Sequence, residues 1–122
     1  MNRILIADPD SATRKALILL LERKLGTNCI TEVKDVETLI RTLADAPPDV
    51  LLLDWRLYGS PAPATCRLLR KAFPQLEIIL LSVDASDASA AKEAGASFIH
   101  KGEPPDELIA TLAPLLRKEN KQ

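Results

Sequence analysis

The chain is poor in residue types on which several kinds of functional site depend. It has 4 glycines, 2 cysteines and 1 histidine among 122 residues. The glycines form no G-x-G-x-x-G run, so the sequence offers no close backbone cradle for a dinucleotide. A lone His100 cannot make a metal site and is expected either to pack or to lie at an edge of the sheet. Cys29 and Cys66 lie far apart, outside any ligand spacing, and we expect buried, reduced thiols.

An excess of charge of one sign is also lacking. The 16 Lys and Arg residues nearly balance the 17 Asp and Glu residues, and the formal net charge is -1. No global field therefore attracts nucleic acid or an anionic membrane, and we expect neither as a direct partner of this domain. The first residues enter a strand-like run at Ile4, without the apolar segment of a secretory signal. The sequence predicts a cytoplasmic protein.

What the chain does contain is a regular alternation of apolar runs and helical patterns. The runs predict five strands, at residues 4–8, 29–33, 50–54, 77–82 and 97–101. Connections between parallel strands are right-handed, so the strands should form a parallel sheet with helices on both faces. The length suits one domain. We expect a single domain over 1–122, with a frayed tail at about 118–122.

Several expectations concern the helices. Ser11 is expected to cap the first helix and Gly26 to end it. The apolar face of this helix is too wide for one stripe, so the helix is either more than half buried or in contact with another chain. The third helix is predicted near 64–73, and Pro114 should kink the last helix or end its regular part.

Four of the apolar runs end on polar side chains: Asp8, Asp54, Ser82 and Lys101. The carboxyl ends of parallel strands meet at one edge of a sheet, where ligands bind. Two carboxylates about 4 Å apart repel by about 4 kcal/mol at an effective dielectric near 20, so they need a cation. Mg²⁺ accepts two carboxylates and leaves room for phosphate oxygens. A carboxylate so placed can attack phosphorus, with Ser82 and Lys101 stabilising the phosphoryl oxygens.

In their order and spacing, these segments resemble the receiver domains of bacterial two-component response regulators. The resemblance covers essentially the whole chain, and segment 101–108 is most similar to receivers that precede a helix-turn-helix output domain. It implies a flavodoxin-like, doubly wound (βα)5 fold of the α/β class, with strand order 2-1-3-4-5. It also implies a signalling domain rather than an enzyme. Such a domain removes its own phosphoryl group and catalyses no other reaction.

The resemblance also implies roles for individual residues and partners. Asp54 is the expected phosphoacceptor, charged by a histidine kinase, a phosphotransfer protein or a small acyl phosphate. Lys101 is the phosphate-contacting lysine, Ser82 the switch hydroxyl, and Phe98 the aromatic side chain whose rotamer follows Ser82. Phosphorylation then changes a surface that binds a downstream output domain or protein, or a second copy of the chain.

The metal site implied by the resemblance contains Asp8, Asp54 and the backbone carbonyl of Arg56, with Mg²⁺ as the ion. Pro9 stands where the family usually has a second acid that contacts the metal, so binding is expected to be weak. Asp10 either replaces that ligand or is a solvent-facing loop residue.

Other departures flank the site. Gly102 stands where a proline often follows the lysine, so that peptide bond is either trans or strained. Arg56 and Asp84 either pair across the mouth of the site or are solvated loop charges.

Two alternatives stay open at the level of sequence. In the first, the chain is a receiver that has lost efficient phosphorylation because of Pro9 and acts as a phosphorylation-independent interaction or dimerisation module. The segment Asp8-Pro9-Asp10 also resembles the nucleophile motif of haloacid-dehalogenase-type phosphatases. Such enzymes need a further acid pair and usually a cap domain, for which this chain has no evident room.

Overall fold

The computed structural model describes the backbone of residues 3–102 and 104–119. Five parallel strands form one sheet in the order β2-β1-β3-β4-β5, which confirms the predicted fold. The strands are β1 (Ile4–Ala7), β2 (Ile30–Val33), β3 (Val50–Asp54), β4 (Glu77–Ser82) and β5 (Ser97–His100). The helices are α1 (Ser11–Leu25), α2 (Val36–Asp45), α3 (Ala62–Ala72), the 3-10 turn η1 (Ala85–Asp87), α4 (Ala88–Glu93) and α5 (Asp106–Glu119).

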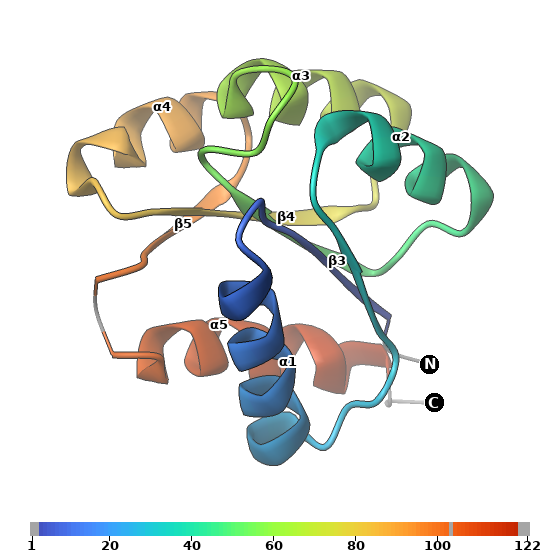
Figure 1. The fold of residues 1–122 in the computed structure, drawn as a ribbon, viewed down its shortest axis with the longest axis vertical. Helices are drawn as coiled ribbons and strands as arrows, with labels where there is room; N and C mark the ends of the chain where they lie inside the picture. The colour runs from blue at the N-terminus through green and yellow to red at the C-terminus, as the bar shows by residue number, and fades with distance from the viewer. Residues whose placement is uncertain (1–2, 103, 120–122) are drawn as a thin grey trace.

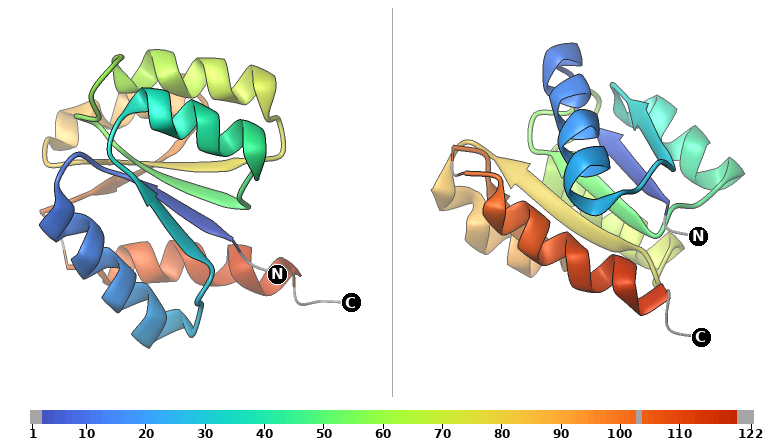
Figure 2. Two further views of the ribbon diagram at one scale, coloured as in Figure 1. Left: turned by 45° about the vertical axis from the view of Figure 1, so that its right-hand side comes forward. Right: turned by 90° about the horizontal axis from the view of Figure 1, so that it is seen from below.

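The helices form two layers around the sheet. Figure 1 shows α2, α3 and α4 above the sheet and α1 and α5 below it. The two further views in Figure 2 show the same arrangement, with α1 and α5 together on one side. Among the described residues, no helix is long and apolar enough to cross a membrane.

Alternate residues of the strands point to opposite faces of the sheet and belong to two separate hydrophobic cores. Leu51 and Leu53 of β3 belong to the cluster under α2, α3 and α4. Val50 and Leu52 belong to the cluster that packs against α1 and α5. Because helices cover both faces, the central strands are apolar at every position rather than at every second one. The polar residues of these strands can therefore lie only at their ends.

The start of α1 differs from the prediction by one residue. The N-cap is Asp10 rather than Ser11, and its carboxylate accepts a hydrogen bond from the backbone N–H of Thr13 at 3.0 Å. Both side chains suit an N-cap, and the extended backbone falls at Asp10, which decides the choice. Gly26 ends α1 as predicted, in the left-handed conformation with φ of 67°.

Prolines are better tolerated in the helices than the sequence suggested. Helix α3 starts at Ala62, so Pro63 lies in the first turn, where no N–H is needed. Helix α5 continues through Pro114 to Glu119, into the segment expected to fray; residues 120–122 lie outside the described part. Leu112 and Leu116, on either side of Pro114, are both buried and anchor α5 to the sheet across the missing hydrogen bond.

The two cysteines are free, but only one is buried. Cys66 of α3 is fully buried, and its thiol donates to the carbonyl of Ala94 at 3.2 Å. Burial raises the pKa of the Cys66 thiol, which keeps it protonated and unreactive. Cys29 is half-exposed, because it precedes the edge strand β2 rather than lying inside it. The expectation of a buried thiol is wrong for Cys29.

Helix α1 does not bury its whole apolar surface. Leu21 is its one buried residue, whereas Leu17 and Ile18 are half-buried against the cluster between the sheet and helices α1 and α5. Leu19 is 55% exposed. The helix is thus not enclosed by its own chain, and the second possibility, contact with another chain, stays a prediction.

Gly59, in the loop between β3 and α3, allows that loop to lie against α2. Its φ is +121°, and a Cβ added there would lie 2.9 Å from the Cβ of Val36. We expect Gly59→Ala to lower the free energy of unfolding by about 2–3 kcal/mol, because both strain and overlap oppose the methyl group. Gly26→Ala is the matched control: its φ is +67° and no atom lies within 4 Å, so it should cost about 1 kcal/mol. Equal losses in urea denaturation would contradict the role of the Val36 contact.

Candidate functional site

One rim of the sheet carries a compact cluster of buried charges. Asp8 follows β1 and Asp54 ends β3, and each is 2% exposed. Lys101 follows β5, and its Nζ donates to Oδ2 of Asp8 at 2.9 Å and to Oδ1 of Asp54 at 2.6 Å. The structure thus brings together three of the four polar strand ends predicted to meet.

The backbone satisfies the other oxygen of each carboxylate. Asp8 Oδ1 accepts from the backbone N–H of Asp10 at 2.8 Å, and Asp54 Oδ2 accepts from that of Arg56 at 2.9 Å. Burial alone would lower the pKa of Lys101, but hydrogen bonds and charges from Asp54 and Asp8 outweigh it and raise that pKa. Lys101 is therefore a fixed cation between two carboxylates, and the cluster has a net charge of -1.

Arg14 of α1 fixes the backbone at Asp8, a role that was not predicted from the sequence. Its Nη1 donates to the backbone carbonyl of Asp8 at 2.7 Å, and its Nε pairs with Glu32 of β2 at 2.7 Å. Lys15 pairs with the same carboxylate, and the hydrogen bonds of Lys15 and then Arg14 lower the pKa of Glu32. The first turn of α1, β2 and the loop after β1 are thereby tied together.

Ser82 ends β4 at the same rim, but its hydroxyl bonds elsewhere. It is 4% exposed, and its Oγ donates to Oδ2 of Asp87 at 2.6 Å and accepts from the backbone N–H of Asp84 at 3.1 Å. Asp87 was not identified from the sequence; the only available signal was a carboxylate five residues after Ser82. Phe98 is half-buried and packs against the cluster under α2, α3 and α4, on β5 opposite Leu80.

The residues around Asp8 fit a magnesium ion only in part. Asp8, Asp54 and the carbonyl of Arg56 can supply oxygen ligands, and Mg²⁺ commonly uses one or two carboxylates and keeps several waters. Asp10 serves as the helix cap in this structure: its Oδ2 bonds to the N–H and hydroxyl of Thr13, which also lower its pKa, and its role as a replacement ligand stays a prediction. Within the described residues no group of three or more His, Cys, Asp or Glu could hold a metal.

The approach to the cluster is open beside these ligands. A hollow of about 420 Å³ is lined by Pro9, Asp10, Arg56 and Tyr58. Pro9 lines its wall at the position where the resemblance predicts a second acid. The donor set is therefore that of a magnesium site with one carboxylate fewer.

Arg56 and Asp84 do not pair in the structure. The carboxylate of Asp84 instead caps η1, accepting from the hydroxyl of Ser86 at 2.7 Å and its N–H at 3.0 Å, and these bonds lower the pKa of Asp84. Arg56 is exposed and lines the hollow together with Pro9, Asp10 and Tyr58. The peptide bond between Lys101 and Gly102 is trans, as no described peptide bond is cis.

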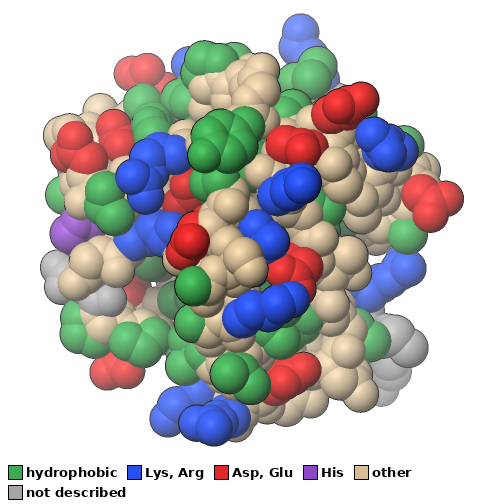
Figure 3. All heavy atoms as spheres, in the orientation of Figure 1, with side chains coloured by type: hydrophobic (Ala, Val, Ile, Leu, Met, Phe, Trp, Pro, Cys, Tyr) green, Lys and Arg blue, Asp and Glu red, His purple; other side chains and the backbone are tan. Residues whose placement is uncertain are grey.

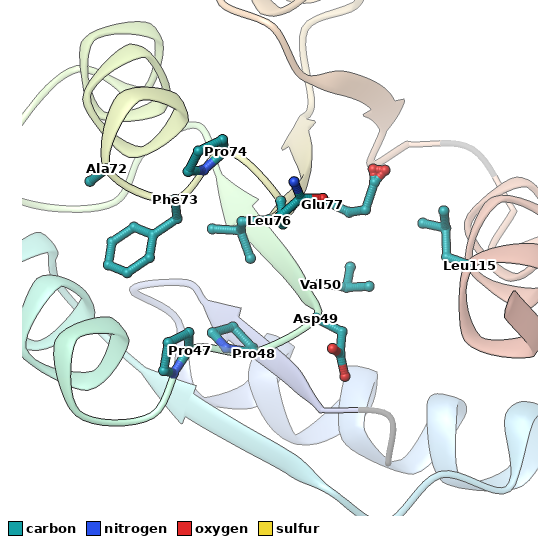
Figure 4. Close-up of a pocket in the computed structure, with 11 residues that line it drawn as sticks. Pro47, Pro48, Asp49, Val50, Ala72, Phe73, Pro74, Leu76, Glu77 and Leu115 are labelled. Atoms are coloured by element: carbon teal, nitrogen blue, oxygen red, sulfur yellow. The ribbon is translucent and has the colours of Figure 1, made fainter. Parts of the chain in front are cut away.

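The remaining surface offers no competing cluster on the visible face. Figure 3 shows Lys and Arg interspersed with Asp and Glu there, in keeping with the net charge of -1. A second hollow, of about 560 Å³, lies at the opposite end of the strands, near the start of β3 and β4. Figure 4 shows residues that line it. Pro47, Pro48, Phe73 and Leu115 are among its lining residues, and it contains none of the predicted site residues.

A five-stranded 2-1-3-4-5 sheet with an Asp, Asp and Lys cluster at its rim is the arrangement expected of a receiver-type signalling domain. The chain belongs to the response regulator receiver domain family, whose model matches residues 4–113. Receivers of this family are signalling domains that generally bind Mg²⁺ and interact with histidine kinases and output domains. The match disfavours the phosphatase alternative.

Curated relatives agree with this assignment. The chain is 30% identical over 120 residues to the phosphate regulon transcriptional regulatory protein PhoB of Pseudomonas aeruginosa, covering 94% of this chain and 52% of that protein. It is also 30% identical to the transcriptional regulatory protein ResD of Bacillus subtilis, covering 96% of this chain and 49% of that protein. The chain therefore spans about half the length of the curated relatives it matches.

Solved structures show the same fold. The isolated REC domain of RcsB from Salmonella enterica serovar Typhimurium, in the presence of the phosphomimetic BeF3-, matches with a TM-score of 0.86 and 24% identity. That match covers 96% of this chain and 90% of the other. The receiver domain of a DNA-binding response regulator from Colwellia psychrerythraea matches with a TM-score of 0.87 and 20% identity, covering 96% and 99%.

Proposed function

We propose that Asp54 is the phosphoacceptor of this receiver domain. The observation that carries the proposal is the ammonium of Lys101, which lies 2.6 Å from Oδ1 of Asp54 and 2.9 Å from Oδ2 of Asp8. It places a positive charge against the buried carboxylate that acts as the nucleophile in this proposal. It also lies where a phosphoryl oxygen bound to Asp54 would need a positive charge.

In the proposed reaction a carboxylate oxygen of Asp54 attacks the phosphorus of a phosphohistidine or a small acyl phosphate. A new O–P bond forms as the bond from phosphorus to the leaving group breaks, and the leaving group departs with that electron pair. Lys101 keeps its proton and neutralises a phosphoryl oxygen, which replaces part of its contact with Asp8. A magnesium ion held by Asp8, Asp54 and the Arg56 carbonyl would offset the remaining phosphoryl charge.

The partners follow from the family and are part of the proposal. A histidine kinase or phosphotransfer protein would supply the phosphoryl group, and an output domain or protein, or a second copy of the chain, would respond to it. Ser82 and Phe98 would move on phosphorylation, changing the face formed by α4, β5 and α5. We propose no further catalytic activity beyond loss of the domain's own phosphoryl group, no direct binding to nucleic acid or membrane, and a cytoplasmic location.

Incubation with acetyl phosphate and Mg²⁺ tests the proposal directly. We expect a mass gain of one phosphoryl group, located at Asp54 by peptide mapping, and a change in fluorescence of Trp55, the single tryptophan next to the site. Beryllofluoride with Mg²⁺ should change the fluorescence in the same way. No mass gain and no fluorescence change would refute the proposal and favour a phosphorylation-independent interaction module.

Pro9 provides a separate prediction about the metal. We expect Pro9→Asp to strengthen Mg²⁺ binding by about tenfold or more, because a second acid beside Asp8 adds an oxygen ligand and a negative charge. Titration of Trp55 fluorescence with MgCl₂ measures the dissociation constant. Pro9→Ala is the control, since it removes the ring without adding a ligand and should leave the affinity unchanged. A Pro9→Asp variant with unaltered affinity would contradict the assignment of the metal side of the site.

A further inference from the structure

The hydroxyl hydrogen of Ser82 is engaged away from Asp54. Ser82 Oγ donates it to Oδ2 of Asp87 at 2.6 Å, while the same oxygen accepts from the N–H of Asp84. A serine hydroxyl has a single hydrogen to donate. It cannot bond to Asp87 and to a phosphoryl oxygen on Asp54 at the same time, so the two acceptors compete for it.

The alternation of side chains along the strands favours Asp87 in this competition. Ser82 lies two residues after Leu80, which faces the cluster under α2, α3 and α4. Asp54 lies two residues after Leu52, which faces the cluster against α1 and α5. Residues two apart in a strand share a face. Ser82 thus begins on the α4 side of the sheet and Asp54 on the other.

Asp87 stands at the junction between η1 and α4. It occupies the N-cap position of α4, where an aspartate usually accepts from the backbone of the following turn. No such side-chain cap bond forms. The carboxylate instead turns back to the hydroxyl of Ser82, in a partly buried hydrogen bond that its charge strengthens.

Helix α4 has little else to hold its N-terminal end. It is six residues long, rich in alanine, and Ala91 is its one buried residue. Small side chains bury little apolar area, so packing contributes less here than in the other helices. The bond between Asp87 and Ser82 is therefore a side-chain link that ties the start of α4 to the end of β4.

We propose that Asp87 is a positioning residue that holds the Ser82 hydroxyl away from Asp54 in the unphosphorylated domain. A phosphoryl group on Asp54 takes the hydrogen of Ser82 from Asp87, and this exchange frees the start of α4. The state of Asp54 is thereby passed to α4 through one hydrogen bond. The inference rests on the proposed role of Asp54 as the phosphoacceptor.

The first test measures beryllofluoride binding, with Mg²⁺ present, by Trp55 fluorescence. Asp87→Ala should tighten binding by about tenfold, because Ser82 no longer has to leave a charged acceptor. Asp87→Glu, which keeps the charge, should restore binding toward that of the unaltered chain. Ser86→Ala is the matched control in η1, because its hydroxyl bonds only Asp84 in this turn. Weaker or unchanged binding by Asp87→Ala would overturn the proposal, since simple structural damage does not tighten binding.

The second test uses hydrogen exchange in the absence of any phosphoryl analogue. Asp87→Ala and Ser82→Ala should each speed exchange of the α4 amides, and the double variant should be no faster than either single one, because both remove the same bond. Additive effects would refute the link. If the unaltered chain takes no beryllofluoride, the phosphoacceptor role of Asp54 fails, while the exchange data still decide whether Asp87 and Ser82 act as one unit.

Discussion

Asp54→Asn is expected to abolish phosphorylation while leaving the fold intact. An amide lacks the nucleophilic oxygen anion, so no acyl phosphate can form at this position. The asparagine can keep one acceptor for Lys101 or Arg56 N–H, and removal of one of two neighbouring carboxylates relieves their repulsion. Mass spectrometry after incubation with acetyl phosphate and Mg²⁺ should show complete loss of the phosphorylated species.

Two further variants, Asp84→Asn and Asp8→Asn, serve as controls for the effect of Asp54→Asn on phosphorylation. Asp84→Asn changes a carboxylate near the site that bonds only within η1 in this structure, so phosphorylation should persist. Asp8→Asn keeps the proposed nucleophile but removes a proposed metal ligand, so phosphorylation should be slowed rather than lost. Phosphorylation of the Asp54→Asn variant would place the acceptor elsewhere. Turnover of a phosphate ester that depends on Asp8 and survives Asp54→Asn would revive the phosphatase alternative.

Lys101→Met should be the most destabilising substitution in the site. It leaves two carboxylates, each 2% exposed, without their shared counterion. Removing one partner of a buried ion pair typically costs about 3–5 kcal/mol, and we expect a loss of that size in urea denaturation at pH 7. Phosphorylation should be lost as well, because no other described side chain in the cluster supplies a positive charge.

The pH dependence of stability identifies the cause of that loss. In the unaltered chain the pKa of Lys101 is raised, so its contribution is complete below 10.5, the ordinary lysine value, and is lost only as the pH rises through the higher folded value. In Lys101→Met, stability should instead recover as the pH falls and one carboxylate takes up a proton. The double variant Lys101→Met with Asp54→Asn should recover much of the stability at pH 7. A Lys101→Met variant that stays equally unstable at all pH values would point to lost packing instead.

The sequence predicts the sheet well because its strongest signals are local. Apolar runs that stop on Asp8, Asp54 and Ser82 locate three strand ends, and burial on both faces explains why those runs do not alternate. The strand order itself came from the resemblance, since periodicity gives elements but not their neighbours.

The errors have local physical causes. Asp10 and Ser11 are both good caps, and only the backbone conformation separates them. The predicted third helix starts near residue 64, after Pro63, because a proline in the first turn of a helix looks the same in sequence as one before it. The bond between Asp87 and Ser82 could not be foreseen, because it depends on how η1 folds back onto β4.

The contacts of Lys101 with Asp8 and Asp54 also determine at what stage of folding the cluster can form. Its partners Asp8 and Asp54 lie 93 and 47 residues earlier in the chain. Contacts so distant in sequence close large loops and form slowly, and a chain made from its N-terminus has Asp8 and Asp54 well before it has Lys101. A nascent or truncated chain without β5 therefore has two unshielded carboxylates and no competent acceptor. The complete cluster therefore depends on the last strand of the sheet, and a chain lacking it should take up no phosphoryl group from acetyl phosphate.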